Sequence, residues 1–85
     1  MDENIENLKN AINLIKFECN SNKDLIQMRN NFYSNIKKIL QNAKDYNQIQ
    51  DFKLEVIKKN RRVEANIYLQ PIVSASEIKL NLSIK

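Results

Sequence analysis

The spacing of apolar residues changes once along the chain, from a helical period to a strand-like one. Up to about residue 44, apolar residues recur every three or four positions, which is the spacing of one face of a helix. From about residue 51 onward they alternate with polar residues, as in strands that are buried on one face only. The pattern therefore predicts helices first and a sheet second.

The helical part divides into a short helix over residues 3–13 and a long helix over about residues 23–44. Residues 14–18 between them fit either a short strand or a continuation of the first helix. The polar cluster at residues 20–22 offers N-cap side chains to the long helix, with Asp24 in its first turn. The expected core residues are Ile5, Leu8 and Ile12 with Ala11 beside them, then Leu25, Met28, Phe32, Ile36, Ile39 and Ala43, widened by Ile26, Tyr33 and Leu40.

Three alternating runs predict an antiparallel sheet. The first covers about residues 51–58, and a hairpin turn with Asn60 in the left-handed region leads into the second at residues 62–70. Pro71 ends this strand because proline cannot donate to a strand ladder. The third run, residues 78–85, still alternates at the last residue, which predicts a strand that is paired inside the sheet or left as an edge for another subunit. The inward-facing residues are expected to be Phe52, Leu54 and Val56, then Val63, Ala65, Ile67 and Leu69, then Ile78, Leu80, Leu82 and Ile84.

These elements predict one α+β domain over residues 1–85. An antiparallel sheet of three to four strands is expected to pack on one long helix, with the short N-terminal helix beside it. Residues 14–18 would supply the fourth strand.

The composition argues against most kinds of catalytic, phosphate-binding and metal-binding site. The chain has no glycine, which excludes glycine-rich phosphate loops and leaves asparagine for turn positions with positive φ. It has no histidine, and its one cysteine, Cys19, is expected to be a small half-buried apolar residue. We therefore predict no catalytic residue, no cofactor-binding residue, no metal ligand and no enzymatic activity.

Two acidic pairs, Asp45 with Asp51 and Glu55 with Glu64, are the nearest approach to acid–base chemistry. Neither pair comes with a nucleophile or a metal set, so both are expected to be surface charges.

The net charge of +4 is unevenly distributed, because residues 1–20 carry −2 and the rest of the chain +6. The candidate contacts to an acidic partner are Lys58, Lys59, Arg61 and Arg62 at the hairpin tip and Lys37 and Lys38 on the long helix. A solvated hairpin end is the simpler interpretation of the tip, since no aromatic residue is interleaved there to stack on bases. Tyr68, on the polar face of its strand, is a candidate interface residue, whereas Tyr33 is expected to line the helix core face.

No run of residues is long and apolar enough to cross a bilayer, and Met1 is followed by two acidic residues where a signal peptide would be positive. We expect synthesis in the cytoplasm and no membrane association.

Several short motifs occur in a distinctive order along the chain. They are Phe17-Glu18 and Asn20 before the long helix, Leu25 near its start, Ile49-Gln50-Asp51-Phe52 after it, and the strand–proline–strand run from Val63 to Lys85. In this order the chain resembles the C-terminal domain of the contractile tail sheath proteins of bacteriophages and related injection machines. The resemblance covers about residues 5–85, with Cys19 standing where that family has a proline.

The resemblance implies a virion structural protein of a contractile tail, whose subunits assemble by strand addition (β-augmentation) into a homo- or hetero-oligomeric ring. Sheath, tube or baseplate subunits would be its partners, and the helix lysines and the hairpin tip would contact the tube. The candidate assembly edges are the strand at residues 14–18 and the closing strand with Ile78, Leu80, Leu82 and Ile84. The start at Met1 favours a small sheath-initiator-like protein, with a terminator, a neck component or a truncated sheath as the other roles.

A second class of function stays open on the residues alone. A small phage regulator or inhibitor could bind a host protein or nucleic acid through the basic hairpin tip, although nucleic acid is the less favoured partner. Binding to nucleic acid would weaken steeply with salt, whereas strand addition would not.

Overall fold

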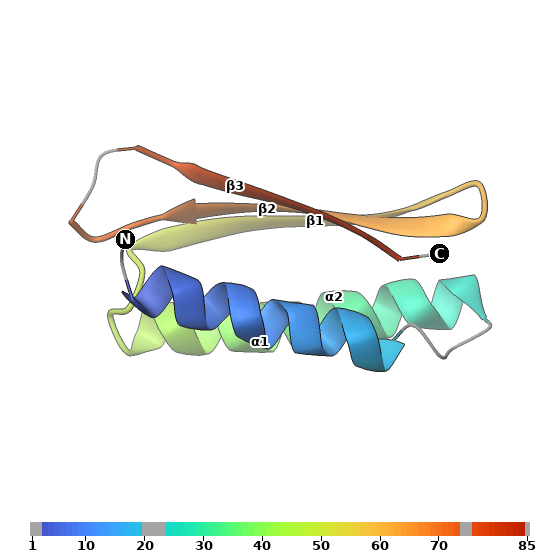
Figure 1. Cartoon of the computed structure of the whole chain (residues 1–85), viewed down its shortest axis with the longest axis horizontal. Coiled ribbons are helices and arrows are strands. Elements are labelled where there is room, and N and C mark those ends of the chain that lie inside the picture. The colour runs from blue at the N-terminus through green and yellow to red at the C-terminus, as the bar shows by residue number, and fades with distance from the viewer. Residues whose placement is uncertain (1–2, 20–23, 74–75, 85) are drawn as a thin grey trace.

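The protein is a two-layer structure in which two helices cover one face of a three-stranded antiparallel sheet (Figure 1). This computed structural model describes residues 3–19, 24–73 and 76–84. The elements are α1 (Glu3–Cys19), α2 (Leu25–Asp45), β1 (Asp51–Lys59), β2 (Arg62–Gln70) and β3 (Ile78–Ile84). The predicted α+β class and antiparallel sheet are confirmed, but the helical layer contains two long helices, and the described sheet has no fourth strand.

Helix α1 runs without interruption through residues 14–18, so the predicted strand there is wrong. Ile15 continues the stripe of the first helical turns and is only 8% exposed, which ties this segment to the core as a helix. Leu14 and Phe17, which suggested a strand, are 63% and 79% exposed. The side chain of Cys19, predicted to be half-buried, lies outside the described residues.

Helix α2 begins at Leu25 because Asp24 is its N-cap. One carboxylate oxygen of Asp24 accepts hydrogen bonds from the backbone N–H groups of Ile26 (3.0 Å) and Gln27 (3.2 Å). The cap candidates at residues 20–22 lie outside the described residues. After Asp45 the chain turns through Asn47, which has a φ of 58°, as expected for an asparagine in a chain without glycine.

The core face of α2 is rotated slightly from the predicted one. Leu40 is fully buried while Ile39 is only half-buried, and Ile26 and Tyr33 are exposed. The expectation that Tyr33 lines the core is therefore wrong. The buried residues of α2 are Met28, Phe32, Ile36, Leu40 and Ala43.

Strand β2 is the centre of the sheet, with β1 on one side and β3 on the other. The β1–β2 hairpin turns at Asn60, which has the predicted positive φ of 56°. Pro71 ends β2 as predicted. The inner residues of β2, namely Val63, Ala65, Ile67 and Leu69, are all fully buried. The inner residues of β1, and those of β3 except Ile84, are only half-buried, because they lie at the margins of the helical layer.

The helices are distributed across the width of the sheet. Helix α1 packs on α2 and β3, and α2 packs on β1 and β2. No helix among the described residues covers the opposite face of the sheet, as Figure 1 shows.

Asp24→Ala should destabilise the protein by about 1 kcal/mol, because two backbone donors at the start of α2 lose their acceptor. Chemical denaturation followed by circular dichroism measures this difference. Asp24→Asn is the control and should be nearly neutral, since asparagine caps as well as aspartate. Equal stability of the alanine variant and the wild type would contradict this role of Asp24.

Ile15→Ala and Leu14→Ala should differ sharply, because only Ile15 is buried. The Ile15 variant should lose about 2–5 kcal/mol of unfolding free energy, and the Leu14 variant should stay within about 0.5 kcal/mol of the wild type. The reverse order in denaturation experiments would indicate that residues 14–18 do not form this helical turn.

Candidate functional site

The outer edge of β3 is the principal candidate site. Within the described sheet, β3 pairs only with β2, so the backbone groups along its other side have no strand partner. Ile84 is buried, whereas Ile78, Leu80 and Leu82 are half-buried although their side chains are on the helix side of the sheet. Three of the four predicted interface residues are therefore only partly covered by the protein itself.

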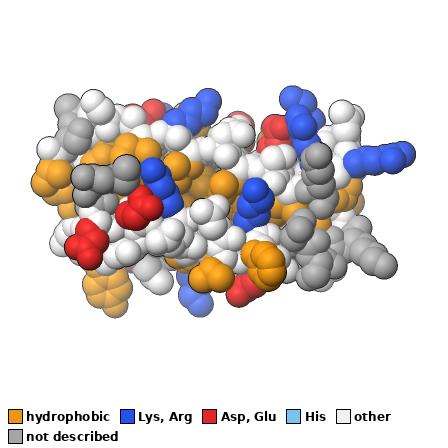
Figure 2. All heavy atoms as spheres, viewed as in Figure 1, with side chains coloured by type: hydrophobic (Ala, Val, Ile, Leu, Met, Phe, Trp, Pro, Cys, Tyr) orange, Lys and Arg blue, Asp and Glu red, His pale blue; other side chains and the backbone are white. Residues whose placement is uncertain are grey.

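An open depression of about 210 Å³ lies where this edge meets α1. Leu80 and Leu82 and the apolar side chain of Ile12 contribute to its lining, and Lys9 and Asn13 contribute polar groups from α1. Seen from the side where α1 and β3 lie in front, apolar side chains are visible in the band between the helices and the sheet (Figure 2). A strand added beside β3 would place its own inward side chains over this depression.

A row of polar side chains crosses the open face of the sheet and ends at the same edge. Asn81 Nδ2 donates to Asn66 Oδ1 at 2.6 Å, and Asn66 Nδ2 donates to Glu55 Oε1 at 3.2 Å. The three residues are directly opposite one another in β3, β2 and β1. Alternation in the sequence assigns Asn66 and Asn81 to the polar faces of their strands, but it does not predict this row, because the row depends on a strand register that alternation alone does not specify.

The edge of β1 is better protected than that of β3. Charged side chains occur along its length, including Lys53, Glu55 and Lys59, whereas Lys79 is the one charged residue of the described β3. Charges on edge strands oppose pairing with another chain. The β3 edge is therefore the more available of the two.

The second predicted assembly edge does not exist. Residues 14–18 are helical, so their backbone groups are used within α1 and cannot add to a sheet.

The six predicted basic contacts are all exposed, but they form two separate groups. Lys37 lies eight residues before the end of α2, about 12 Å along the helix, whereas Lys58 lies seven residues after the start of β1, roughly 23 Å along the strand. Since a short turn reverses the chain between α2 and β1, the hairpin tip lies toward the opposite end of the molecule from the C-terminus of α2 (Figure 1). Lys38 belongs to the helix group, and Lys59, Arg61 and Arg62 belong to the tip group.

One basic side chain in each group has a local partner. A guanidinium nitrogen of Arg62 is 2.7 Å from a carboxylate oxygen of Glu64, and Lys37 Nζ is 5.6 Å from the centre of the Tyr33 ring. Tyr68, the predicted interface residue on the open face, has Lys79 Nζ at 5.5 Å from its ring centre.

In the two acidic pairs considered from the sequence, each carboxylate interacts with a non-acidic side chain and not with the other acid of its pair. Asp45 accepts from Gln41, Glu55 accepts from Asn66 and Glu64 pairs with Arg62. Asp51 Oδ1 lies 3.2 Å from Lys44 Nζ. Each acid has a different partner, as expected for surface charges.

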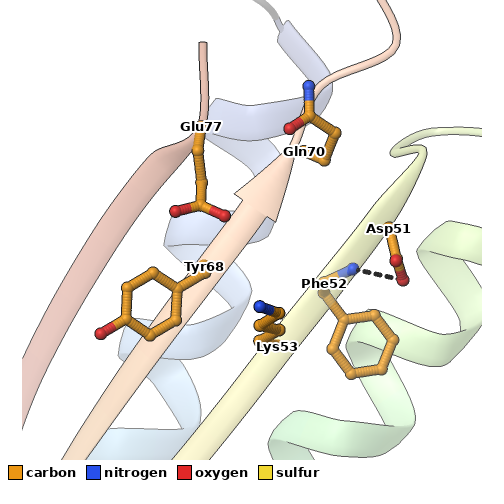
Figure 3. A pocket seen from close by; sticks show the side chains of 6 residues that line it. All are labelled: Asp51, Phe52, Lys53, Tyr68, Gln70 and Glu77. Carbon is orange, nitrogen blue, oxygen red and sulfur yellow. Dashed lines mark hydrogen bonds between the residues drawn. The ribbon is translucent and has the colours of Figure 1, made fainter. Parts of the chain in front are cut away.

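A second depression, of about 130 Å³, opens on the face of the sheet without helices (Figure 3). Lys53, Tyr68 and Glu77 lie on one side of the strands in this view, whereas the ring of Phe52 lies toward α2. All of these groups are exposed or half-buried. The depression offers polar contacts to a partner.

In residues 3–19, 24–73 and 76–84, no three acidic, cysteine or histidine side chains come together in a way that could hold a metal ion. The helices of the same segments include none with the length and apolarity needed to span a membrane.

No protein-family model, curated protein or solved structure matches this chain.

The pKa of Asp51 lies below its ordinary value of 3.8, first because the backbone N–H of Phe52 donates to its carboxylate and then because of Lys44. Lys44→Ala should therefore raise this pKa without restoring it fully, as followed by NMR titration. Lys53→Ala is the control and should change it less, because its attraction is the weakest of these contributions. A larger change from the Lys53 variant would contradict this order.

The same carboxylate predicts a pH dependence of stability. A lowered pKa in the folded state stabilises the protein fully above pH 3.8, and this contribution is lost as the pH falls through the lowered pKa. The difference in unfolding free energy between the wild type and Asp51→Asn should therefore be constant at neutral pH and shrink only in acid. A difference that grows on acidification would contradict this linkage.

Proposed function

We propose that this protein is a structural assembly module, and that the edge of β3 accepts a strand from a neighbouring subunit. The observation that carries the proposal is a strand edge that has no strand partner among the described residues and lies beside a partly covered apolar depression. An added strand would pair with the backbone of β3 and cover Leu80 and Leu82. Backbone pairing would supply affinity, and the alternating side chains would supply specificity.

The setting we propose is a contractile phage tail or a related injection machine, with sheath, tube or baseplate subunits as partners. The support is the sequence resemblance, above all in the long helix and in the strand–proline–strand run that follows it. The part of the resemblance at Phe17 and Glu18 carries no weight for strand exchange, because these residues are helical. The protein would then be a virion component without catalytic activity.

We assign contacts with acidic partner surfaces to the hairpin tip. Lys58, Lys59 and Arg61 are exposed and lie together beside one turn, while Arg62 is engaged with Glu64. Exposed clusters of this kind steer association more than they add affinity. The competing function, a regulator that binds nucleic acid or a host protein through this tip, would depend on the tip rather than on β3.

Leu80→Lys should abolish most incorporation into tail particles, because a charge on the inward face of an edge strand opposes strand addition. Leu54→Lys is a matched control, since Leu54 and Leu80 are both half-buried and are opposite the same residue, Ile67, from the two edges of the sheet. Co-purification with sheath, tube and baseplate subunits is the measurement, with circular dichroism as the test of folding.

Wild-type incorporation of a folded Leu80→Lys variant would show that β3 is not the assembly edge. Binding to DNA that falls steeply with salt, together with no affinity for tail subunits, would favour the regulator.

A further inference from the structure

We propose that the strand added to β3 is β3 of a second copy of this chain, antiparallel to the first about a twofold axis at Asn81. The two sheets would form one continuous sheet of six strands with four helices on one face. This inference rests on the proposed function of the β3 edge and specifies the partner that the edge accepts.

The sequence of β3 is complementary to itself in this register. Centring the pair on Asn81 is the one antiparallel arrangement that pairs all seven residues of the strand. Lys79 is then opposite Ser83 of the second copy, so no like charges are opposed. Leu80 is opposite Leu82 of the second copy, and Ile78 is opposite Ile84, which covers the half-buried leucines from both sides.

The polar row across the sheet continues through the twofold axis. The Nδ2 group of Asn81 uses one hydrogen on Asn66, and its second hydrogen and its Oδ1 are directed to no other described residue. Two Asn81 side chains that meet at the axis can each donate to the other. The row from Glu55 through Asn66 to Asn81 would then extend across all six strands.

The first helices are complementary in charge about the same axis. The depression places Lys9 and Asn13 of α1 at the level of Asn81, so the axis passes near the middle of α1. Glu6 and Lys16 share this side of the helix, because residues 6, 9, 13 and 16 follow the three- and four-residue spacing of one face. They are about equally far from the axis, so Glu6 of one copy lies near Lys16 of the other.

The edge of β1, on the other side of the sheet, is not complementary to itself in this way. Pairing β1 with itself over its whole length would oppose Glu55 to Glu55 of the second copy and Lys58 to Phe52. Like charges at the axis and a lysine on the apolar side both disfavour that arrangement. The self-complementarity is therefore a property of β3 and not of edge strands in general.

Ser83→Lys tests this interface, because it opposes the new lysine to Lys79 of the second copy at two symmetric positions. Dimer dissociation should become about tenfold or more easier, as measured by sedimentation equilibrium up to roughly 100 μM protein. Within the chain, the new lysine is beside Glu64, so folding should be preserved. The double variant Ser83→Lys/Lys79→Glu should restore the dimer, because the opposed charges become opposite in sign.

Ile57→Lys is the matched control. Ile57 is opposite the same Glu64 from β1, so this variant adds the same charge beside the same residue at the other edge. It should leave the dimer unchanged. Loss of the dimer in Ile57→Lys but not in Ser83→Lys would overturn the inference, as would failure of the double variant to restore it.

A monomeric wild type at these concentrations would also overturn the inference. If Leu80→Lys then still blocked incorporation into tails, the β3 edge would keep its assembly function with a different protein as its partner. If Leu80→Lys incorporated normally, the proposed function would fail as well.

Discussion

The inner face of β2 is fully buried, and the positions of the helices and of the two outer strands follow from this burial. Val63, Ala65, Ile67 and Leu69 are completely removed from solvent by side chains such as Phe32, Ile36 and Leu40. Three strands about 4.8 Å apart are roughly as wide as the separation between two packed helices. The central strand therefore lies over the interior of the helical layer, where coverage is complete, with α2 packed on β1 and β2 and α1 packed on β3. The half-buried residues of β1 and β3 follow from this geometry.

The same geometry separates structural from interaction surfaces. A domain of this size leaves a large share of its surface exposed, because a small chain buries a limited share of its area. Its uncovered apolar surface includes the sheet margins, the depression along β3 and exposed side chains such as Leu14, Phe17, Tyr46 and Val73. Both margins of the described sheet combine backbone groups that have no strand partner with half-buried apolar residues, but β3 carries far fewer charged side chains than β1. The β3 margin can therefore select a partner by strand register as well as by the apolar area that the partner covers.

The two edges differ because of the residues that face outward, and these residues have no role in the core. The inward-facing residues of β1 and β3 are buried to a similar extent. Leu54 and Leu80, for example, are opposite Ile67 from the two sides and are both half-buried. The outward positions carry charges along β1 and mainly amide or hydroxyl groups along β3. Charge on β1 opposes pairing, whereas the amide of Asn81 extends a hydrogen-bonded row to the very edge of the sheet. Core formation and edge availability are thus encoded in different positions of the same strands.

Local spacing and backbone preference predict most of the elements, the hairpin at Asn60, the end of β2 at Pro71 and the buried face of each strand, so these features can be read from the sequence. The sequence does not show whether residues 14–18 form a strand or a helix, because Leu14, Ile15 and Phe17 fit both the strand period and the helix period over so short a run. The packing of Ile15 in the core is what makes this segment a helix. The candidate residues on β3 could be listed from alternation alone. That this strand is at an edge beside α1, and that Glu55, Asn66 and Asn81 align, was decided only by the tertiary structure, because strand order and register join residues far apart in the chain.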